Sequence, residues 1–314
     1  MVAPRRVFVT GLGVVSPHGN DPDAVFRSVA DATSAVRLVE TGADEVAAEL
    51  LMASASDFDP GDVISAPDRI FMARTSEMAV VAAHGALGQA GLRDDPDALA
   101  GAGVYMGCGL GGSEAMEDGY QRFYGRRTRR ARPKTVPLIM ANGPAAHLSM
   151  RWGIRGPTMT YSMACASSSA AVGEAFPALR DGRVDRALAG GSEAMLTGGI
   201  MAAWDALGVV ATEHADGPAA SCRPFDAGRT GMVLGEGAAV LVLETEDAME
   251  TRGATPLAEL LGYGTTSDAH NITEPRPEGQ VRAMREALAA AGLEPAQVGY
   301  VNAHATGTDT GDLV

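Results

Sequence analysis

Apolar residues in this chain form short runs that alternate with longer stretches in which they recur at helical spacing. Residues 73–90 show this spacing and are followed by Gly91, a residue suited to the left-handed end of a helix. Further helices are predicted over residues 167–179 and 280–291. Strands are predicted between Gly-rich turns, at residues 103–107, 157–162, 187–189, 238–244 and 298–301. The alternation predicts a largely parallel α/β sheet that is buried on both faces.

The N-terminal segment and the segment after Leu257 extend this pattern. Residues 7–15 are a β-branched run that Gly11 and Gly13 interrupt, so we expect a buried strand followed by a tight turn. A second α/β pattern begins near Leu257 and includes the predicted helix and strand of the last part of the chain. Together with the length of 314 residues, this predicts two α/β units.

The composition is that of a globular protein, with 46% hydrophobic and 20% charged residues. A net charge of −14 argues against nucleic-acid binding. No uninterrupted apolar stretch reaches about 18 residues, so no membrane span is expected, and residues 1–10 lack the apolar run of a signal peptide. Three widely spaced cysteines fit neither a disulfide framework nor a metal site, and they indicate a reducing cytoplasm: Cys108, Cys165 and Cys222.

Cys165 is the first candidate for chemistry, because it lies between a predicted strand and a predicted helix. Free backbone N–H groups and the positive end of the helix dipole stabilise a thiolate at such a position. The small neighbours Ala164 and Ala166 leave room for a tight elbow. At such an elbow the carbon of a substrate carbonyl can approach the sulfur while the carbonyl oxygen approaches a backbone N–H. A buried structural cysteine is the alternative, and core packing is the expected role of Cys108.

His304 is the second candidate. It follows a predicted strand, at the edge of an α/β sheet where ligands bind. A histidine there could donate a hydrogen bond to a developing oxyanion or move a proton. Thr306 and Thr308 could bind the amide groups of a long, thin substrate. A loop histidine that is capped by these threonines is the alternative.

Residues 126–134 are a basic run in an acidic chain, with six basic residues among nine. Such a run is usually a solvated surface segment. In a protein of net charge −14 it is also the place that could attract an acidic partner, mainly by raising the association rate.

Eight short motifs are spread along nearly the whole chain. They are Val-Thr-Gly-Leu-Gly at 9–13, Gly-Cys-Gly-Leu-Gly-Gly at 107–112, Gly-Ile-Arg-Gly-Pro at 153–157, Ala-Cys-Ala-Ser-Ser at 164–168, Ala-Gly-Gly-Ser-Glu-Ala at 189–194, Arg-Pro-Phe-Asp at 223–226, Gly-Glu-Gly-Ala at 235–238 and Asn-Ala-His-Ala-Thr-Gly-Thr at 302–308. In this order they resemble the motifs of the elongating 3-oxoacyl-[acyl-carrier-protein] synthases of type II fatty-acid synthesis and of their polyketide ketosynthase relatives. One such motif would be weak, but eight in order make a specific pattern.

The resemblance implies a thiolase-like fold of the α/β class, a five-layered α-β-α-β-α sandwich of two related halves, with the second half incomplete in this chain. Residues 1–250 would be the N-terminal half that carries the nucleophile, and residues 251–314 the start of the C-terminal half. The family further implies a homodimer, or a heterodimer with a ketosynthase-like subunit. Its substrates are carried on the phosphopantetheine of acyl carrier protein, with no bound cofactor.

The resemblance also implies roles for single residues. In a ping-pong reaction Cys165 takes the acyl group and its N–H helps to form the oxyanion hole. Malonyl-carrier protein then loses carbon dioxide, with His304 assisting, and the carbanion attacks the thioester. Thr306 and Thr308 match positions that bind the pantetheine arm.

Two further sets of positions match the family. Leu110 matches a position that lines the acyl pocket. Residues 136–139, which include Val136 and Ile139, resemble the segment that reaches across the dimer towards that pocket. The patch that docks the acidic carrier protein is matched by Arg129 and Arg130.

The family continues beyond the point at which this sequence stops, with a second catalytic histidine, a lysine and a Gly-rich loop. We therefore expect a truncated chain, a partner that supplies the remainder, or a degenerate protein. Two other functions stay open. One is a non-catalytic subunit similar to chain-length factors, against which Cys165 counts, and the other is a non-decarboxylating thiolase or acyltransferase. Fatty-acid and polyketide pathways both fit, and the serines at 167–169 favour a polyketide or polyene system.

Overall fold

The computed structural model describes residues 4–41, 48–126 and 132–314. The chain divides into two compact units, each built from segments that are far apart in the sequence. The first unit comprises Met1–Thr33, Ser54–Ile200 and Gly235–Leu260. The second comprises Ser34–Ala53, Met201–Leu234 and Leu261–Val314.

A six-stranded sheet forms the centre of the first unit, in the order β5-β4-β6-β8-β1-β9. The strands are β1 (Val7–Val15), β4 (Gly103–Gly107), β5 (Thr158–Tyr161), β6 (Arg186–Glu193), β8 (Gly237–Thr245) and β9 (Ala258–Leu260). Strands β5, β4 and β6 pair in parallel, whereas β8 pairs antiparallel with both β6 and β1, and β9 antiparallel with β1. The prediction of a largely parallel sheet was therefore wrong, because apolar runs mark buried strands but not the direction in which the chain enters them.

Strand β1 also differs from its prediction. The chain does not turn at Gly11 and Gly13 but continues as one strand of nine residues, with an irregularity in its pairing to β8 between Val9 and Gly11. A Cβ atom on Gly11 would lie 2.2 Å from the carbonyl oxygen of Ala86, and one on Gly13 would lie 1.8 Å from that of Ala82. The glycines are thus required for the close approach of a helix, not for a turn.

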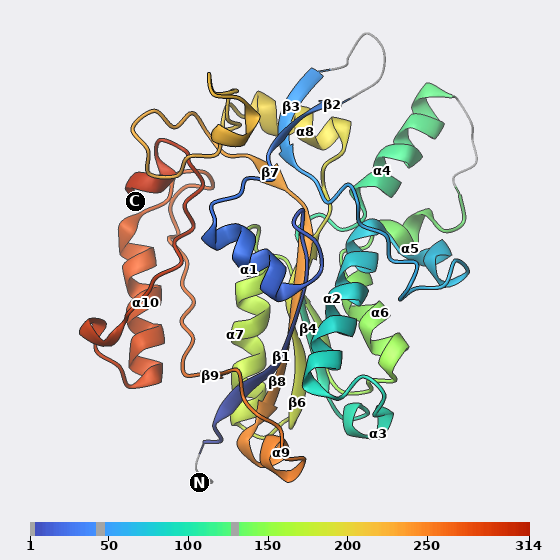
Figure 1. Ribbon diagram of the computed structural model, residues 1–314, viewed down its shortest axis with the longest axis vertical. Coiled ribbons are helices and arrows are strands. Elements are labelled where there is room, and N and C mark those ends of the chain that lie inside the picture. Colours follow the sequence, from blue (N-terminus) through green and yellow to red (C-terminus); the bar gives the residue numbers. More distant parts are fainter. Residues whose placement is uncertain (1–3, 42–47, 127–131) are drawn as a thin grey trace. The chain divides into compact units, whose positions relative to one another are not determined.

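That helix is α2 (Arg74–Ala90), and it ends as predicted at Gly91, which has a left-handed φ of 70°. Figure 1 shows α2 and α6 (Gly143–Trp152) on one side of the strands and α7 (Ser167–Arg180) on the other. The sheet is therefore covered on both faces, as the apolar runs predicted. The central part of α2 is fully buried and consists largely of alanine and valine, which lets it pack closely on β1.

The remaining helices of the first unit are shorter and lie between these elements in the chain. They are α1 (Pro22–Ala30), the 3₁₀ helix η2 (Asp68–Phe71), α3 (Pro96–Leu99), α4 (Ser113–Tyr120), the π-helix η3 (Gln121–Gly125), α5 (Thr135–Ile139) and α9 (Glu246–Thr251). In the part of the chain that the structure describes, no helix is both long and apolar enough to cross a membrane.

The second unit contains a three-stranded sheet in the order β2-β3-β7. Its strands are β2 (Arg37–Thr41), β3 (Ala48–Ala53) and β7 (Leu234–Gly235), and β2 and β3 pair antiparallel. Its longest helix is α10 (Pro277–Ala291), which confirms the predicted helix. The other helical segments of this region are α8 (Gly198–Ala206), which begins in the first unit, and the 3₁₀ turns η4 (Pro218–Ala220), η5 (Pro295–Gln297) and η6 (Gly311–Leu313). The strand predicted over residues 298–301 is wrong, since these residues are exposed and lie outside any strand.

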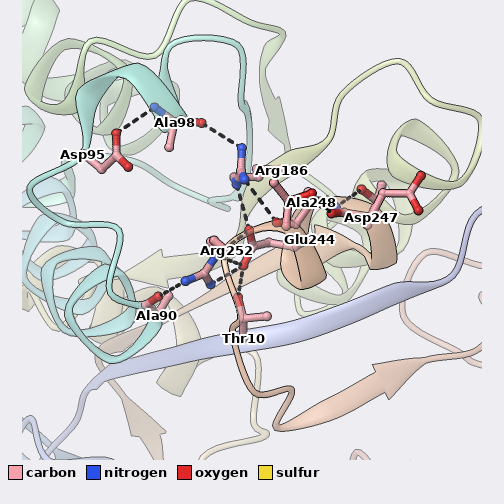
Figure 2. A network of polar contacts seen from close by, with 11 residues as sticks. Thr10, Ala90, Asp95, Ala98, Arg186, Glu244, Asp247, Ala248 and Arg252 are labelled. Carbon is pink, nitrogen blue, oxygen red and sulfur yellow. Dashed lines mark hydrogen bonds and ion pairs between the residues drawn. The ribbon is translucent and has the colours of Figure 1, made fainter.

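A polar network surrounds Glu244, which lies on β8 and is fully buried (Figure 2). Thr10 Oγ1 donates to Glu244 Oε2 over 2.7 Å, Arg186 Nε donates to Oε1 over 2.7 Å, and the Arg252 guanidinium donates to both oxygens. The two arginines also donate to the backbone carbonyls of Ala90, Ala98 and Ala248. Burial would raise the pKa of Glu244, but the hydrogen bonds from Arg252, Thr10 and Arg186 outweigh it and lower the pKa. The carboxylate is therefore charged and joins β1, β6 and β8.

Candidate functional site

The three parallel strands of the first unit end at one edge of the sheet, and the loops that follow them meet there. Residues 108–112 follow β4, residues 162–165 follow β5 and residues 194–197 follow β6. The carboxyl ends of parallel strands are where α/β sheets bind ligands. The structure therefore places Cys165 at the edge of the sheet where chemistry is expected.

Cys165 is exposed and lies two residues before the first residue of α7. Ala164, just before it, has a left-handed φ of 49°, which is uncommon for a residue other than glycine. Ser167 Oγ stabilises this turn because it donates to the Ala164 carbonyl over 2.7 Å and accepts from the Met163 N–H over 2.8 Å. The result is a tight strand-to-helix elbow that presents the thiol to solvent.

Two glycines allow the elbow to lie directly on the sheet. A Cβ on Gly107, at the end of β4, would lie 2.3 Å from the backbone carbon of Ser167. A Cβ on Gly191, in β6, would lie 2.7 Å from the Cβ of Ser168. Any larger residue at either position would push the first turn of α7, and Cys165 with it, away from the strands.

The other two cysteines have different surroundings. Cys108 is buried, and burial raises the pKa of its thiol to about 11. Cys222 is exposed as a residue, but desolvation of its thiol also raises its pKa. A thiol with a raised pKa forms less of the reactive thiolate at neutral pH. The core position of Cys108 agrees with the packing role expected for it.

Glu193, the last residue of β6, also lies at this edge. No role was predicted for it, although it lies within one of the eight motifs. Its Oε2 accepts hydrogen bonds from the backbone N–H groups of Gly109 (2.7 Å) and Leu110 (3.2 Å). Burial raises the pKa of the Glu193 carboxyl, although these N–H groups and that of Ala194 act in the opposite direction. An acidic residue at the end of a buried strand of small residues was the signal that could have identified it.

The predicted acyl-pocket residues lie close to this edge. Leu110 is 42% exposed in the loop after β4, Val136 is exposed on α5, and Ile139 ends that helix. A Cβ on Gly111 would lie 2.6 Å from the carbonyl oxygen of Ile139, so the loop that carries Leu110 packs against the end of α5. Arg129 and Arg130, the predicted docking residues, lie outside the described residues.

A cavity of about 410 Å³ lies between the first turns of α2 and α4 and helix α5. Its described lining includes the buried Ser113 together with Glu114, Thr135 and Leu138. It does not include Leu110, Val136 or Cys165. The cavity is mostly polar in character, with arginine and carboxylate side chains in its wall.

His304, Thr306 and Thr308 belong to the second unit. His304 is exposed, and the next residue, Ala305, has a left-handed φ of 47°. The hydroxyls of Thr306 and Thr308 hydrogen-bond to each other over 3.0 Å.

The loop of His304 is fixed by Asp312, which is almost fully buried. Asp312 Oδ1 accepts from the N–H of Gly307 over 3.0 Å, and Oδ2 pairs with Arg229 over 3.5 Å. A buried ion pair of this kind holds the backbone of the loop in one conformation. Across the described residues, no group of three or more His, Cys, Asp or Glu side chains is arranged to hold a metal ion.

Two family models match the chain. The model described as "Beta-ketoacyl synthase, N-terminal domain" matches residues 4–248, and that described as "Beta-ketoacyl synthase, C-terminal domain" matches residues 257–314.

Among curated proteins, "3-oxoacyl-[acyl-carrier-protein] synthase 2" of Staphylococcus aureus (strain COL) is 35% identical over 311 residues, which cover 98% of this chain and 75% of the relative. "Nodulation protein E" of Rhizobium sp. (strain N33) is 37% identical over 313 residues, with coverage of 98% and 75%.

Solved structures are similar as well. A beta-ketoacyl synthase from Burkholderia phymatum STM815 has a TM-score of 0.89 and 32% identity, covering 98% of this chain and 76% of that one. "The ishigamide ketosynthase/chain length factor" has a TM-score of 0.90 and 30% identity, with coverage of 99% and 75%. The fold of the chain is therefore the thiolase-like fold of ketosynthases.

Proposed function

The chain belongs to the beta-ketoacyl synthase family of condensing acyltransferases, and from this we propose that it elongates an acyl group held as a thioester on Cys165. The observation that carries the proposal is the position of Cys165. It is an exposed thiol on a tight elbow before α7, at the edge where three parallel strands end.

The first half-reaction is acyl transfer. The Cys165 thiolate attacks the thioester carbonyl of an acyl chain on carrier-protein phosphopantetheine, and the backbone N–H of Cys165 donates to the oxyanion. The bond from the carbonyl carbon to Sγ forms, the bond to the pantetheine sulfur breaks, and the carrier thiol leaves with the proton that Cys165 gave up. The phosphopantetheine arm is the substrate carrier, and the reaction requires no resident cofactor.

The second half-reaction is condensation. Malonyl-carrier protein binds and loses carbon dioxide, and the α-carbon carbanion attacks the acyl carbonyl on Cys165. The carbon–carbon bond forms, the bond to Sγ breaks, and the thiolate takes up a proton again. We assign His304 to stabilisation of the enolate, as a hydrogen-bond donor to its oxygen, and Thr306 and Thr308 to the pantetheine amides.

We propose an acyl carrier protein and a ketosynthase-like subunit as partners. One solved relative, AntDE:AntF, is described as a type II acyl-carrier protein in complex with its ketosynthase. The edge strand β5 supports a subunit contact, because its Met159 is 48% exposed and the nearby Met163 is 46% exposed. The three free cysteines are compatible with a reducing cytoplasm, which we propose as its location.

The experiment that tests the proposal is an intact-mass measurement after incubation of the folded protein with an acyl-carrier protein. We expect the mass to rise by one acyl group, and peptide mapping to place it on Cys165. Cys165→Ala should abolish the adduct, whereas the matched control Cys222→Ala should retain it, because the Cys222 thiol has a raised pKa. An adduct that persists in Cys165→Ala would refute the assignment of the nucleophile.

A chain-length-factor-like subunit is the second candidate function. It is favoured by the solved structures of ketosynthases together with their chain length factors. A subunit of that kind would form a stable complex with a ketosynthase but take no acyl group itself. The absence of an adduct on a folded chain that co-purifies with a ketosynthase would favour it.

A further inference from the structure

We propose that Glu193 is a positioning residue of the condensing site, whose carboxyl fixes the loop after β4 and thereby sets which acyl chains Cys165 accepts. The inference rests on the proposed function and goes further, because it assigns a role in acyl-chain specificity to Glu193, a residue that does not itself react. Three observations carry it: the bonds of the carboxyl, its lack of a basic partner among the described residues, and its closeness to Gly109.

The bonds of Glu193 join the loops at the catalytic edge. Its Oε2 accepts from two consecutive N–H groups, those of Gly109 and Leu110. The carbonyl of Gly109 in turn accepts a hydrogen bond from Ser162 Oγ over 3.3 Å, and Ser162 lies three residues before Cys165. One side chain on β6 therefore determines where the loop after β4 lies, and that loop contacts the segment that enters the elbow.

The surroundings of Glu193 are unlike those of an ordinary structural carboxylate. Glu244, in the same sheet, is paired with two arginines. In the described chain, Glu193 instead bonds to backbone N–H groups and not to a basic side chain. Glu193 is partly buried, and a carboxylate that is desolvated without a counter-charge costs free energy. That cost is compensated where the acid orients backbone groups that the site requires.

The hydrogen bond that Glu193 accepts from the Leu110 N–H connects this carboxyl to acyl-chain selectivity. The Leu110 side chain is partly exposed and extends from the backbone that Glu193 holds. Loss of the carboxyl lets the loop shift, and a shifted Leu110 changes the space for an acyl chain long enough to reach it. A short acyl group does not extend that far, so its transfer depends less on Glu193.

The first test compares acetyl and long-chain acyl-carrier proteins as donors to Cys165, with adduct formation followed by intact mass. We expect Glu193→Ala to slow long-chain transfer about tenfold more than acetyl transfer, which corresponds to about 1.4 kcal/mol. Glu193→Gln should restore the wild-type ratio, because its amide oxygen can accept both N–H groups. An equal loss for both donors, together with a lower melting temperature, would reduce Glu193 to a structural role and overturn the inference.

A second test uses Gly109 and does not depend on Glu193→Ala being stable. A Cβ on Gly109 would lie 2.7 Å from Glu193 Oε2 and 3.9 Å from Glu193 Cδ, and apart from the neighbouring residues in the chain no other described atom lies within 4 Å of it. Gly109→Ala should therefore change the ratio of long-chain to acetyl transfer in the wild type but change it little further in the Glu193→Ala background. The effects of the two substitutions would then be non-additive in a double-mutant cycle. Wild-type selectivity in Gly109→Ala would contradict the inference. If the wild type takes no acyl group from any donor, the proposed function itself fails, and this inference with it.

Discussion

Two carboxyl groups of the first unit, the fully buried Glu244 and the partly buried Glu193, show how the surroundings of a residue determine its pKa. Glu244 accepts hydrogen bonds from two arginines and Thr10, and its pKa is lowered. Glu193 accepts only from backbone N–H groups in the described structure, and burial raises its pKa. A buried charge is stable only where interactions with its partners compensate the free energy of lost hydration. The first carboxyl therefore stabilises the fold, and the second positions a loop.

Glu244→Gln should lower the free energy of unfolding near neutral pH by about 3–5 kcal/mol, because it leaves two arginines beside a neutral group in a buried site. Urea unfolding followed by circular dichroism measures this. The matched control is Glu250→Gln, on the exposed end of α9, for which a change of no more than about 0.5 kcal/mol is expected.

The pH dependence of the same variant has a defined sign. Because the pKa of Glu244 is lowered from 4.5, its contribution to stability is fully present above that pH and is lost as the pH falls through the folded-state pKa. The difference between wild type and Glu244→Gln should therefore shrink in acid. A difference that stays constant down to the acid limit of folding would contradict the charged state of Glu244.

At the scale of elements, the contact between β1 and α2 depends on residues without bulk. Gly11 and Gly13 face the carbonyl oxygens of Ala86 and Ala82, and those two alanines are fully buried. The strand and helix approach more closely than larger side chains would allow. The same principle holds at Gly107 below the first turn of α7. Small residues in this sheet therefore determine where its helices lie.

Gly13→Ala should destabilise the protein by about 1–3 kcal/mol, the usual cost of an added methyl group in a packed core. The added Cβ would meet the backbone of α2 at 1.8 Å, so the helix would have to move. Thermal unfolding provides the measurement. Gly101→Ala is the control, because in the described part of the structure no atom beyond the chain neighbours lies within 4 Å of its Cβ position. An equal loss of stability in both variants would exclude the packing explanation.

At the scale of the whole molecule, charge governs encounters with a partner. The chain carries a net charge of −14, and residues 126–134 form its one basic run. An acidic carrier protein is repelled by the molecule as a whole, so a local basic segment is needed to attract it. The docking residues Arg129 and Arg130 lie outside the described residues, and their role stays a prediction.

Reversal of Arg129 and Arg130 to Glu changes the net charge by two units at each position, from −14 to −18. We expect weaker binding of acyl carrier protein, with the larger effect at low salt, because screening reduces charge interactions. Surface plasmon resonance at two salt concentrations checks this. The control reverses Arg282 and Arg285 on α10, which changes the net charge equally. Equal weakening by both pairs would indicate bulk charge and not a docking site.

The elements that depend on local periodicity could be predicted from the amino-acid sequence. Helix α2 ends where Gly91 predicts, and α7 begins two residues after Cys165. The motifs also identified the family, since eight short segments in order are specific to it. These features are readable because side-chain spacing and helix ends involve residues that are neighbours in the chain.

The tertiary structure alone decided how the strands pair and which residues the edge brings together. Strand β1 pairs with β8 so that Val7 lies opposite Thr245, and residues 298–301 remain outside any strand despite their apolar pattern. Glu193 acquires its role only because β4 and β6 end side by side. Such contacts join residues that are distant in the chain, and no local pattern encodes the partner that supplies a hydrogen bond or accepts a strand.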